Sequence, residues 1–273
     1  MYVLILSYRL ECTTDPSLCT DGSHQILADY LDRTGSPSRA ATHHDAASKL
    51  RDGILDLFWS SKTSSFYDYN LTSNARNGFY TPAAFYPFWV GIIPPDVLSD
   101  QTKAFSAFSS INMVLNRYNG TIPSSLTNTG LKWDMPNAWP PHQYIALQAL
   151  RNLPSNLTTN TIPSGQSYDL IPAGQLGIPG AELPPQPIRG SGIYTRTDIS
   201  RLNGTVVNGG LAQANEGWGR ALQRQLANRY IAAVYCSWVA TGGSIPSLLP
   251  TRLQPGEFNW TRTSNITFGN VCG

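Results

Sequence analysis

Hydrophobic residues recur at helical spacing in several stretches of the chain, and this periodicity is the main indication of its fold. After Pro94-Pro95-Asp96, apolar side chains fall at i, i+4, i+7 and i+11 on one helix face: Ala104, Phe108, Ile111 and Leu115. From about Glu216 to Ala240, apolar or aromatic side chains repeat every four residues: Leu222, Leu226, Tyr230 and Val234. Almost no segment alternates between apolar and polar residues, so the pattern predicts an all-α class with long loops.

Another helix is expected to open at Pro140-Pro141, because proline is favoured in the first helical turn. Its inward-facing side chains are Ile145, Leu147 and Leu150.

The N-terminal third is expected to contain one helix, which begins near Thr42. The spacing of Thr42 to Asp45 suits a capping box. The apolar face of this helix consists of Ala47, Leu50, Ile54, Leu57 and Phe58. Residues 1–40 lack a clear period and are rich in Thr, Ser, Asp and Gly, which predicts a poorly ordered segment. The main domain is then expected to span residues 41–273.

Glycine and proline are concentrated between residues 154 and 210. Glycine loses more conformational entropy on folding than other residues, and proline lacks a backbone N–H donor. Neither residue therefore favours a helix or a strand. The composition predicts a long surface loop or insertion, without a long helix in Pro172–Ser191.

Composition narrows the class of protein. Only 13% of the 273 residues are charged, 11% are aromatic and the net charge is +2. Disorder is therefore not expected, and no Lys/Arg run provides a nucleic-acid-binding surface. No apolar run approaches the roughly 20 residues that a membrane span requires.

Six Asn-x-Ser/Thr sequons favour passage through a secretory pathway. They start at Asn70, Asn119, Asn156, Asn203, Asn259 and Asn265. The apolar stretch at residues 1–6 is too short and wrongly flanked for a secretion signal, so a native N-terminus is expected to be missing. A secreted, vacuolar or extracellular location follows as an expectation.

The four cysteines match no zinc-binding spacing and allow three full disulfide connectivities. They are Cys12, Cys19, Cys236 and Cys272. Cys236 lies in an apolar helical stretch, where a free buried thiol is the favoured interpretation.

The segment from Leu131 to Tyr144 carries the strongest chemical signal. It contains two tryptophans, Trp133 and Trp139, together with Asp134, Asn137 and three prolines. Indole faces stack on the apolar C–H faces of sugar rings, while carboxylate and amide groups bond sugar hydroxyls. Because prolines stiffen the loop, little ordering entropy remains to be lost on binding. We expect Trp133, Asp134, Asn137 and Trp139 to share one concave surface, with both indoles flanking the polar groups.

This segment resembles a signature of the trehalases, family 37 of the glycoside hydrolases: Gln-Trp-Asp-x-Pro-x-(Gly/Ala/Val)-Trp-(Pro/Ala/Ser)-Pro. Every fixed position matches except the first, where Lys132 replaces Gln. Three further segments, at residues 66–70, 85–89 and 215–220, occur in the order expected of the C-terminal half of a trehalase. Their amino-acid sequences are similar to those of the secreted fungal branch. The resemblance implies an (α/α)6 barrel and an inverting hydrolase that cleaves α,α-trehalose into two glucose molecules, without a cofactor.

Other family segments are missing from the printed sequence. The signature Pro-Gly-Gly-Arg-Phe-x-Glu-x-Tyr-x-Trp-Asp is absent, as are the segments that carry the general acid and the general base. The resemblance therefore implies a partial barrel formed by an internal piece of a trehalase, without a catalytic residue of its own. We expect it to be weakly active or inactive alone.

Two acids lie among site-like aromatic residues. Asp134 is expected to accept hydrogen bonds from sugar hydroxyls, with a structural role as a helix cap as the alternative. Glu216 is favoured as a structural group at a helix start, in i,i+4 order with Arg220, and it could also form a pocket wall with Trp218.

The histidines give weaker signals. His43 and His44 are adjacent and therefore point apart on a helix, so a metal site there is not expected. His142 is expected to be a helix-start residue near the rim of the site.

Two function classes remain open from sequence. The first is a trehalase-family glycoside hydrolase, and the second is a non-catalytic or vestigial carbohydrate-binding helical protein. Another helical-toroid hydrolase, such as a glucoamylase-like enzyme, is disfavoured by the segment Trp133–Pro141.

Overall fold

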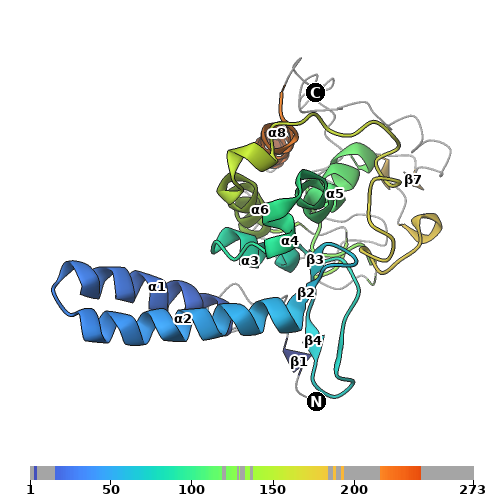
Figure 1. The fold of residues 1–273 in the computed structure, drawn as a ribbon. Coiled ribbons are helices and arrows are strands. Elements are labelled where there is room, and N and C mark those ends of the chain that lie inside the picture. Colours follow the sequence, from blue (N-terminus) through green and yellow to red (C-terminus); the bar gives the residue numbers. More distant parts are fainter. Residues whose placement is uncertain are drawn as a thin grey trace.

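The structure, a computed structural model, describes residues 3–4, 16–118, 121–127, 129, 133–135, 138–183, 187–188, 192–193 and 216–240. This part of the chain is mostly helical, in agreement with the predicted class (Figure 1). The α-helices are α1 (Pro16–Arg33), α2 (Pro37–Phe58), α3 (Tyr86–Trp89), α4 (Pro95–Ser99), α5 (Gln101–Arg117), α6 (Pro140–Asn152) and α8 (Trp218–Ala240). Short 3-10 helices are η1 (Pro82–Phe85), η2 (Ser155–Leu157) and η3 (Gly180–Glu182).

The strands in the described part of the chain form small antiparallel ribbons. They are β1 (Val3–Leu4), β2 (Trp59–Ser60), β3 (Ser65–Phe66), β4 (Tyr69–Asn70), β5 (Ala75–Arg76), β6 (Pro187–Ile188) and β7 (Gly192–Ile193). β4 lies between β1 and β5, while β2 pairs with β3 and β6 pairs with β7. In the β2–β3 pair, Trp59 lies opposite Phe66, which brings two aromatic residues to the start of the core.

Helices α1 and α2 form an antiparallel pair that extends away from the other described helices (Figure 1). This differs from the expectation of a poorly ordered segment over residues 1–40. Residues 16–33 are helical instead, and α2 already begins at Pro37. Ala28 and Leu31 of α1 are buried, because each helix supplies the other with an apolar partner.

The predicted cap at Thr42 is wrong. The residue at the start of α2 is Ser36, followed by a proline in the first turn that fixes φ for a helix. Thr42 lies inside the helix, where its hydroxyl donates a hydrogen bond to the Ser38 carbonyl at 3.3 Å. On the predicted face, Ala47, Ile54 and Phe58 are buried.

Helix α5 is the centre of the core. All four residues of its predicted stripe are buried, and so are Met113 and Val114 on other faces. Buried residues lie on nearly every face of α5, so other elements must enclose it, and α5 packs against α4 and α8. Asp100 has an extended backbone conformation and separates α5 from α4. It also caps the N-terminus of α5, because its carboxylate accepts a hydrogen bond from the Thr102 N–H at 2.7 Å.

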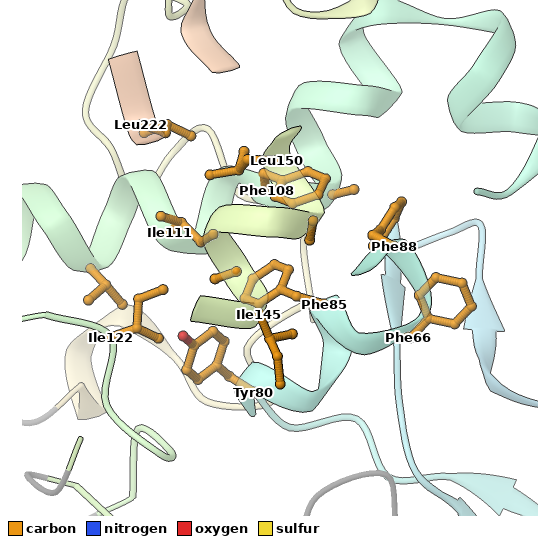
Figure 2. Close-up of a cluster of buried hydrophobic side chains, with 14 of the residues drawn as sticks. Phe66, Tyr80, Phe85, Phe88, Phe108, Ile111, Ile122, Ile145, Leu150 and Leu222 are labelled. Atoms are coloured by element: carbon orange, nitrogen blue, oxygen red, sulfur yellow. The ribbon is translucent and has the colours of Figure 1, made fainter. Parts of the chain in front are cut away.

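Aromatic rings connect the elements around α5 (Figure 2). Phe108 contacts Phe85 with ring centroids 5.4 Å apart and Phe88 at 5.0 Å. Phe88 in turn contacts Phe66 at 5.4 Å, nearly perpendicular. Pairs in this range add to the free energy of burial itself. The cluster therefore links α5, η1, α3 and the β2–β3 ribbon in one continuous core.

The described part of the Gly/Pro-rich segment, residues 154–183, is irregular as predicted, with only η2 and η3 as helical turns. It is not a detached surface loop, however, because Leu157, Leu176 and Leu183 are buried in the core. Gln175 fixes the segment. Its amide nitrogen donates to the carbonyls of Thr63 at 2.9 Å and Ser106 at 2.8 Å, and its side-chain oxygen accepts from Ser109.

The start of α8 is docked on residues 157–160. The Trp218 backbone N–H donates to the Asn160 carbonyl at 2.7 Å, and the indole N–H donates to the Leu157 carbonyl at 3.0 Å. A Cβ at Gly217 would lie 2.2 Å from the Thr158 oxygen, so only glycine allows this approach. Leu222 and Leu226 of the predicted stripe are buried beneath this contact.

We predict that Gly177→Ala destabilises the protein more than Gly174→Ala. Both glycines have positive φ, +70 and +85, but a Cβ at Gly177 would lie 2.0 Å from the Gly78 oxygen, against 3.8 Å to a Thr63 methyl at Gly174. The backbone conformation alone costs about 1–2 kcal/mol in either variant, and the clash adds about 1–3 kcal/mol at Gly177. Equal free energies of unfolding in a denaturant titration would contradict this packing.

Candidate functional site

The segment with the strongest sequence signal leads directly into α6. The structure describes its residues 133–135 and 138–144, while Leu131, Lys132, Pro136 and Asn137 lie outside the described residues. The proposed role of Asn137 therefore stays a prediction. Pro140 and Pro141 open α6 as predicted, so the loop ends on a rigid helix.

Asp134 is held by hydroxyl groups from the preceding loop. Its Oδ1 accepts from the Ser125 hydroxyl at 2.9 Å, and its Oδ2 accepts from the Thr129 hydroxyl. The Met135 N–H donates to the Thr127 carbonyl at 2.9 Å, which ties the same two loops through the backbone. The carboxylate of Asp134 thus has a fixed orientation, and its oxygens face hydroxyl donors.

The two indoles of the loop stack on one another. The ring centroids of Trp133 and Trp139 are 4.3 Å apart and the planes differ by 17°. Both side chains are half-buried. This differs in detail from indoles that flank the polar groups, because one face of each ring is covered by the other.

Gln143 anchors the loop that precedes Asp134, and sequence reasoning did not identify it. Its amide is fully buried and pairs with the backbone of Ile122: the side-chain oxygen accepts from the N–H at 3.1 Å, and Nε2 donates to the carbonyl at 2.8 Å. The same oxygen also accepts from the Thr121 hydroxyl. The available signal was an amide residue one helical turn after Trp139, on the side of α6 that carries Ala146 and Leu150.

His142 lies beneath the indole pair rather than at a rim. Its side chain is only 4% exposed, and its ring centroid is 6.2 Å from Trp133 and 6.4 Å from Tyr86. Its Nδ1 has no hydrogen-bond partner in the described part of the chain. Burial lowers the pKa of His142 to about 4, because charging the ring would require desolvating a cation. The imidazole is therefore neutral at ordinary pH.

Glu216 and Trp218 have structural contacts. Glu216 forms a salt bridge with Arg224 at 2.7 Å, instead of the predicted pair with Arg220, because α8 begins only at Trp218. Arg220 is exposed. The Trp218 ring is buried and packs nearly perpendicular to Phe105, with centroids 5.5 Å apart. The structure thus places Trp218 inside the core.

The adjacent histidines on α2 point apart, as predicted. His44 bonds Asp32 at 3.1 Å, while His43 contacts His24 of α1. Within the described residues no group of three or more His, Cys, Asp or Glu is arranged to hold a metal ion. In the same part of the chain, no helix is long and apolar enough to cross a membrane.

Two of the six sequons lie in the described residues. Asn156 is exposed, whereas Asn70 is half-buried and its side-chain oxygen accepts from the backbone N–H of Thr72 at 2.9 Å. The remaining four, at Asn119, Asn203, Asn259 and Asn265, lie outside, as do Cys12, Cys272 and the side chains of Cys19 and Cys236.

We predict a pH-dependent loss of stability that originates at His142. Its pKa falls from 6.5 when exposed to about 4 when folded, so between these values only the unfolded state binds the proton. The contribution is fully present above pH 6.5 and is lost as the pH falls towards 4, by at most about 3 kcal/mol. The free energy of unfolding of wild type should therefore fall relative to that of His142→Leu as the pH falls across this window. Parallel pH curves would contradict the burial of a neutral imidazole.

The family model and the similar curated proteins indicate the same family. Residues 20–165, more than half of the 273-residue chain, match the family model Trehalase. The chain is 29% identical over 136 residues to a trehalase of Oryctolagus cuniculus, covering 50% of this chain and 23% of that protein. It is 31% identical over 128 residues to a trehalase of Pimpla hypochondriaca, covering 47% and 22%. The matched region therefore spans less than a quarter of the length of these relatives.

A solved structure, neutral trehalase from Saccharomyces cerevisiae, is similar with a TM-score of 0.47 and 16% sequence identity, covering 95% of this chain and 38% of that one. The family match over residues 20–165 contains the Trp133–Trp139 loop with its anchored carboxylate, as well as α2, α5 and α6. This chain belongs to the trehalase family.

Proposed function

We propose that this chain forms part of the sugar-binding site of an α,α-trehalase, an inverting glycoside hydrolase that releases two glucose molecules. The observation that carries the proposal is the pairing of an indole stack with a carboxylate that hydroxyl groups hold in place. An aromatic face and an oriented acceptor are the two elements that a sugar ring requires.

In this site, one indole of the Trp133–Trp139 stack receives the C–H face of a glucose unit, and the amide of Asn137 is expected to add a hydrogen bond. Asp134 accepts a sugar hydroxyl. A carboxylate offers about four acceptor positions, so it can bind a sugar while it keeps the Ser125 and Thr129 hydroxyls. The amide pairing of Gln143 with Ile122 keeps the loops ordered before binding, which reduces the entropy cost.

Hydrolysis with inversion also needs two carboxyl groups about 6.5–9.5 Å apart, one to protonate the leaving group and one to activate water. Asp134 is engaged with hydroxyl donors and Glu216 with Arg224, so neither has the role of a mobile acid or base. We infer that this chain alone binds sugar without cleaving it, and that the acid and base belong to family segments not found in its sequence.

The same engagement of both acids favours a second candidate, a non-catalytic carbohydrate-binding protein that retains part of the site. The genomic sequence on both sides of this chain separates the two. A flanking reading frame with the family's acid and base segments supports the hydrolase, and its absence supports the vestigial form.

We further propose that the protein derives from the secreted fungal branch of the family, as part of its C-terminal half in an (α/α)6 barrel. Secretion or a vacuolar location is supported by the six sequons, of which Asn156 is exposed and accessible to glycosylation. Peptide mapping of the protein from its native source, with and without deglycosylation, tests this location.

We predict that the purified chain binds trehalose but releases no glucose above the uncatalysed rate. General acid–base assistance is worth about 10²–10⁴-fold for each positioned group, and both groups are absent. Glucose release is measured with a coupled assay, and binding is measured by titrating the tryptophan fluorescence. Turnover like that of a complete trehalase would mean that the catalytic pair has been misplaced, and Asp134 and Glu216 would be the first residues to mutate.

Asp134→Asn should weaken trehalose binding about tenfold, because a hydrogen bond to a charged acceptor is worth about 1.5 kcal/mol or more. Asp45→Asn is the matched control, since this exposed carboxylate lies on α2 and forms a salt bridge with Lys49 of the same helix. Equal affinities for the two variants would refute the assignment of Asp134 as a sugar acceptor.

A further inference from the structure

Two histidines from different helices meet in the α1–α2 pair. The Nδ1 atoms of His24 on α1 and His43 on α2 are 2.6 Å apart, and the ring centroids are 4.9 Å apart with the planes tilted by 39°. At this distance one Nδ1 carries a proton and the other accepts it. The lone-pair directions of two imidazoles therefore converge on one point between the helices.

We propose that His24 and His43 form a site for a divalent transition cation that favours imidazole ligands, such as Ni²⁺ or Zn²⁺. The cation would take the place of the proton between the two Nδ1 atoms, and that proton would move through solvent to Nε2 of the same neutral ring. Water would complete the coordination. Because the described residues hold no group of three such ligands, this is a two-ligand site that is open to solvent.

The geometry requires a small adjustment. Metal–nitrogen bonds of about 2.0–2.1 Å place two imidazole nitrogens about 3 Å apart at a common ion, slightly more than the present separation. Both rings are half-buried, so a cation reaches them from solvent and the rings have room to turn. The helices that carry them pack mainly against one another, so a small separation does not disturb the core around α5.

The buried carboxylate of Asp21 contributes to the electrostatic potential at the histidine pair. Asp21 lies one helical turn before His24 and is fully buried, and its Oδ2 is 4.0 Å from the Arg51 guanidinium. Gln25 also donates to its oxygens at 3.2 and 3.3 Å. Burial raises the pKa of Asp21, while Arg51, Gln25 and His24 act in the opposite direction. The negative charge of Asp21 favours a cation beside His24, and the Arg51 guanidinium opposes it from a side chain that is 42% exposed.

The chemistry distinguishes classes of cation. Imidazole nitrogen suits Ni²⁺, Cu²⁺ and Zn²⁺, whereas Mg²⁺ and Ca²⁺ require oxygen ligands that this pair does not offer. Binding would join α1 to α2 and thus stabilise the folded helical pair by mass action.

The test is a calorimetric titration of the complete 273-residue chain with Ni²⁺, beside His24→Gln, His43→Gln and His44→Gln. Glutamine keeps the polarity and approximate size, and His44 is the matched control because it lies next to His43 but bonds Asp32 instead. All variants keep the four cysteines, so binding by thiolates contributes equally to each. Circular dichroism and thermal unfolding establish that each variant is folded.

We expect one Ni²⁺ per chain for wild type and His44→Gln, at least about tenfold weaker binding for each of the other two variants, and no heat with Mg²⁺. Ni²⁺ should also raise the melting temperature of wild type and His44→Gln only. Absence of binding to wild type would overturn the proposal. Unchanged affinity in His24→Gln and His43→Gln, or a loss confined to His44→Gln, would overturn it as well.

Discussion

The packing of Phe108 in the middle of α5 is the interaction on which the other elements depend. Its ring contacts Phe85 and Phe88 on one side and Trp218 on the other, with centroids 5.0–6.0 Å apart. Phe88 continues the contact to Phe66 of the β2–β3 ribbon (Figure 2). A single buried ring thus lies between segments that are more than 100 residues apart in the chain. A smaller side chain there would remove contacts with three elements at once and leave a cavity.

Buried amides fix the parts that hydrophobic packing cannot. Gln175 joins the irregular segment at residues 154–183 to the β2–β3 turn and to α5, and Gln143 joins α6 to the loop before Asp134. A buried irregular segment lacks the regular backbone hydrogen bonds of a helix or strand, so its backbone groups need other partners. The side-chain amides of Gln175 and Gln143 supply such partners. The close approach of Gly177 to Gly78 and of Gly217 to Thr158 has the same effect, since each brings two backbones together without a side chain between them.

The difference between local hydrophobic patterns and long-range amide hydrogen bonds explains which features the sequence could predict. The stripe on α5 and the opening of α6 at Pro140 follow from local rules, namely period and proline geometry, and the structure confirms both. Helix α1 was missed because its pattern is weak, and it is stabilised by α2 rather than by its own propensity. The pairs Gln175–Ser106 and Gln143–Ile122 span 69 and 21 residues, so no local period could indicate them. In the candidate site, residue types predicted the indole pair and the carboxylate, whereas the stacking of the rings and the hydroxyl donors to Asp134 depend on tertiary contacts.

The loop around Asp134 is ordered by contacts between residues that are close in the sequence. The site is ordered by contacts within residues 121–143, all of which lie inside the family match, and does not depend on a catalytic group. Sugar binding requires an aromatic face and an oriented acceptor, which short-range contacts can supply. Inverting hydrolysis requires two carboxyl groups about 6.5–9.5 Å apart that face the scissile bond from opposite sides. The indole stack and the anchored carboxylate can therefore form independently of the groups that transfer protons.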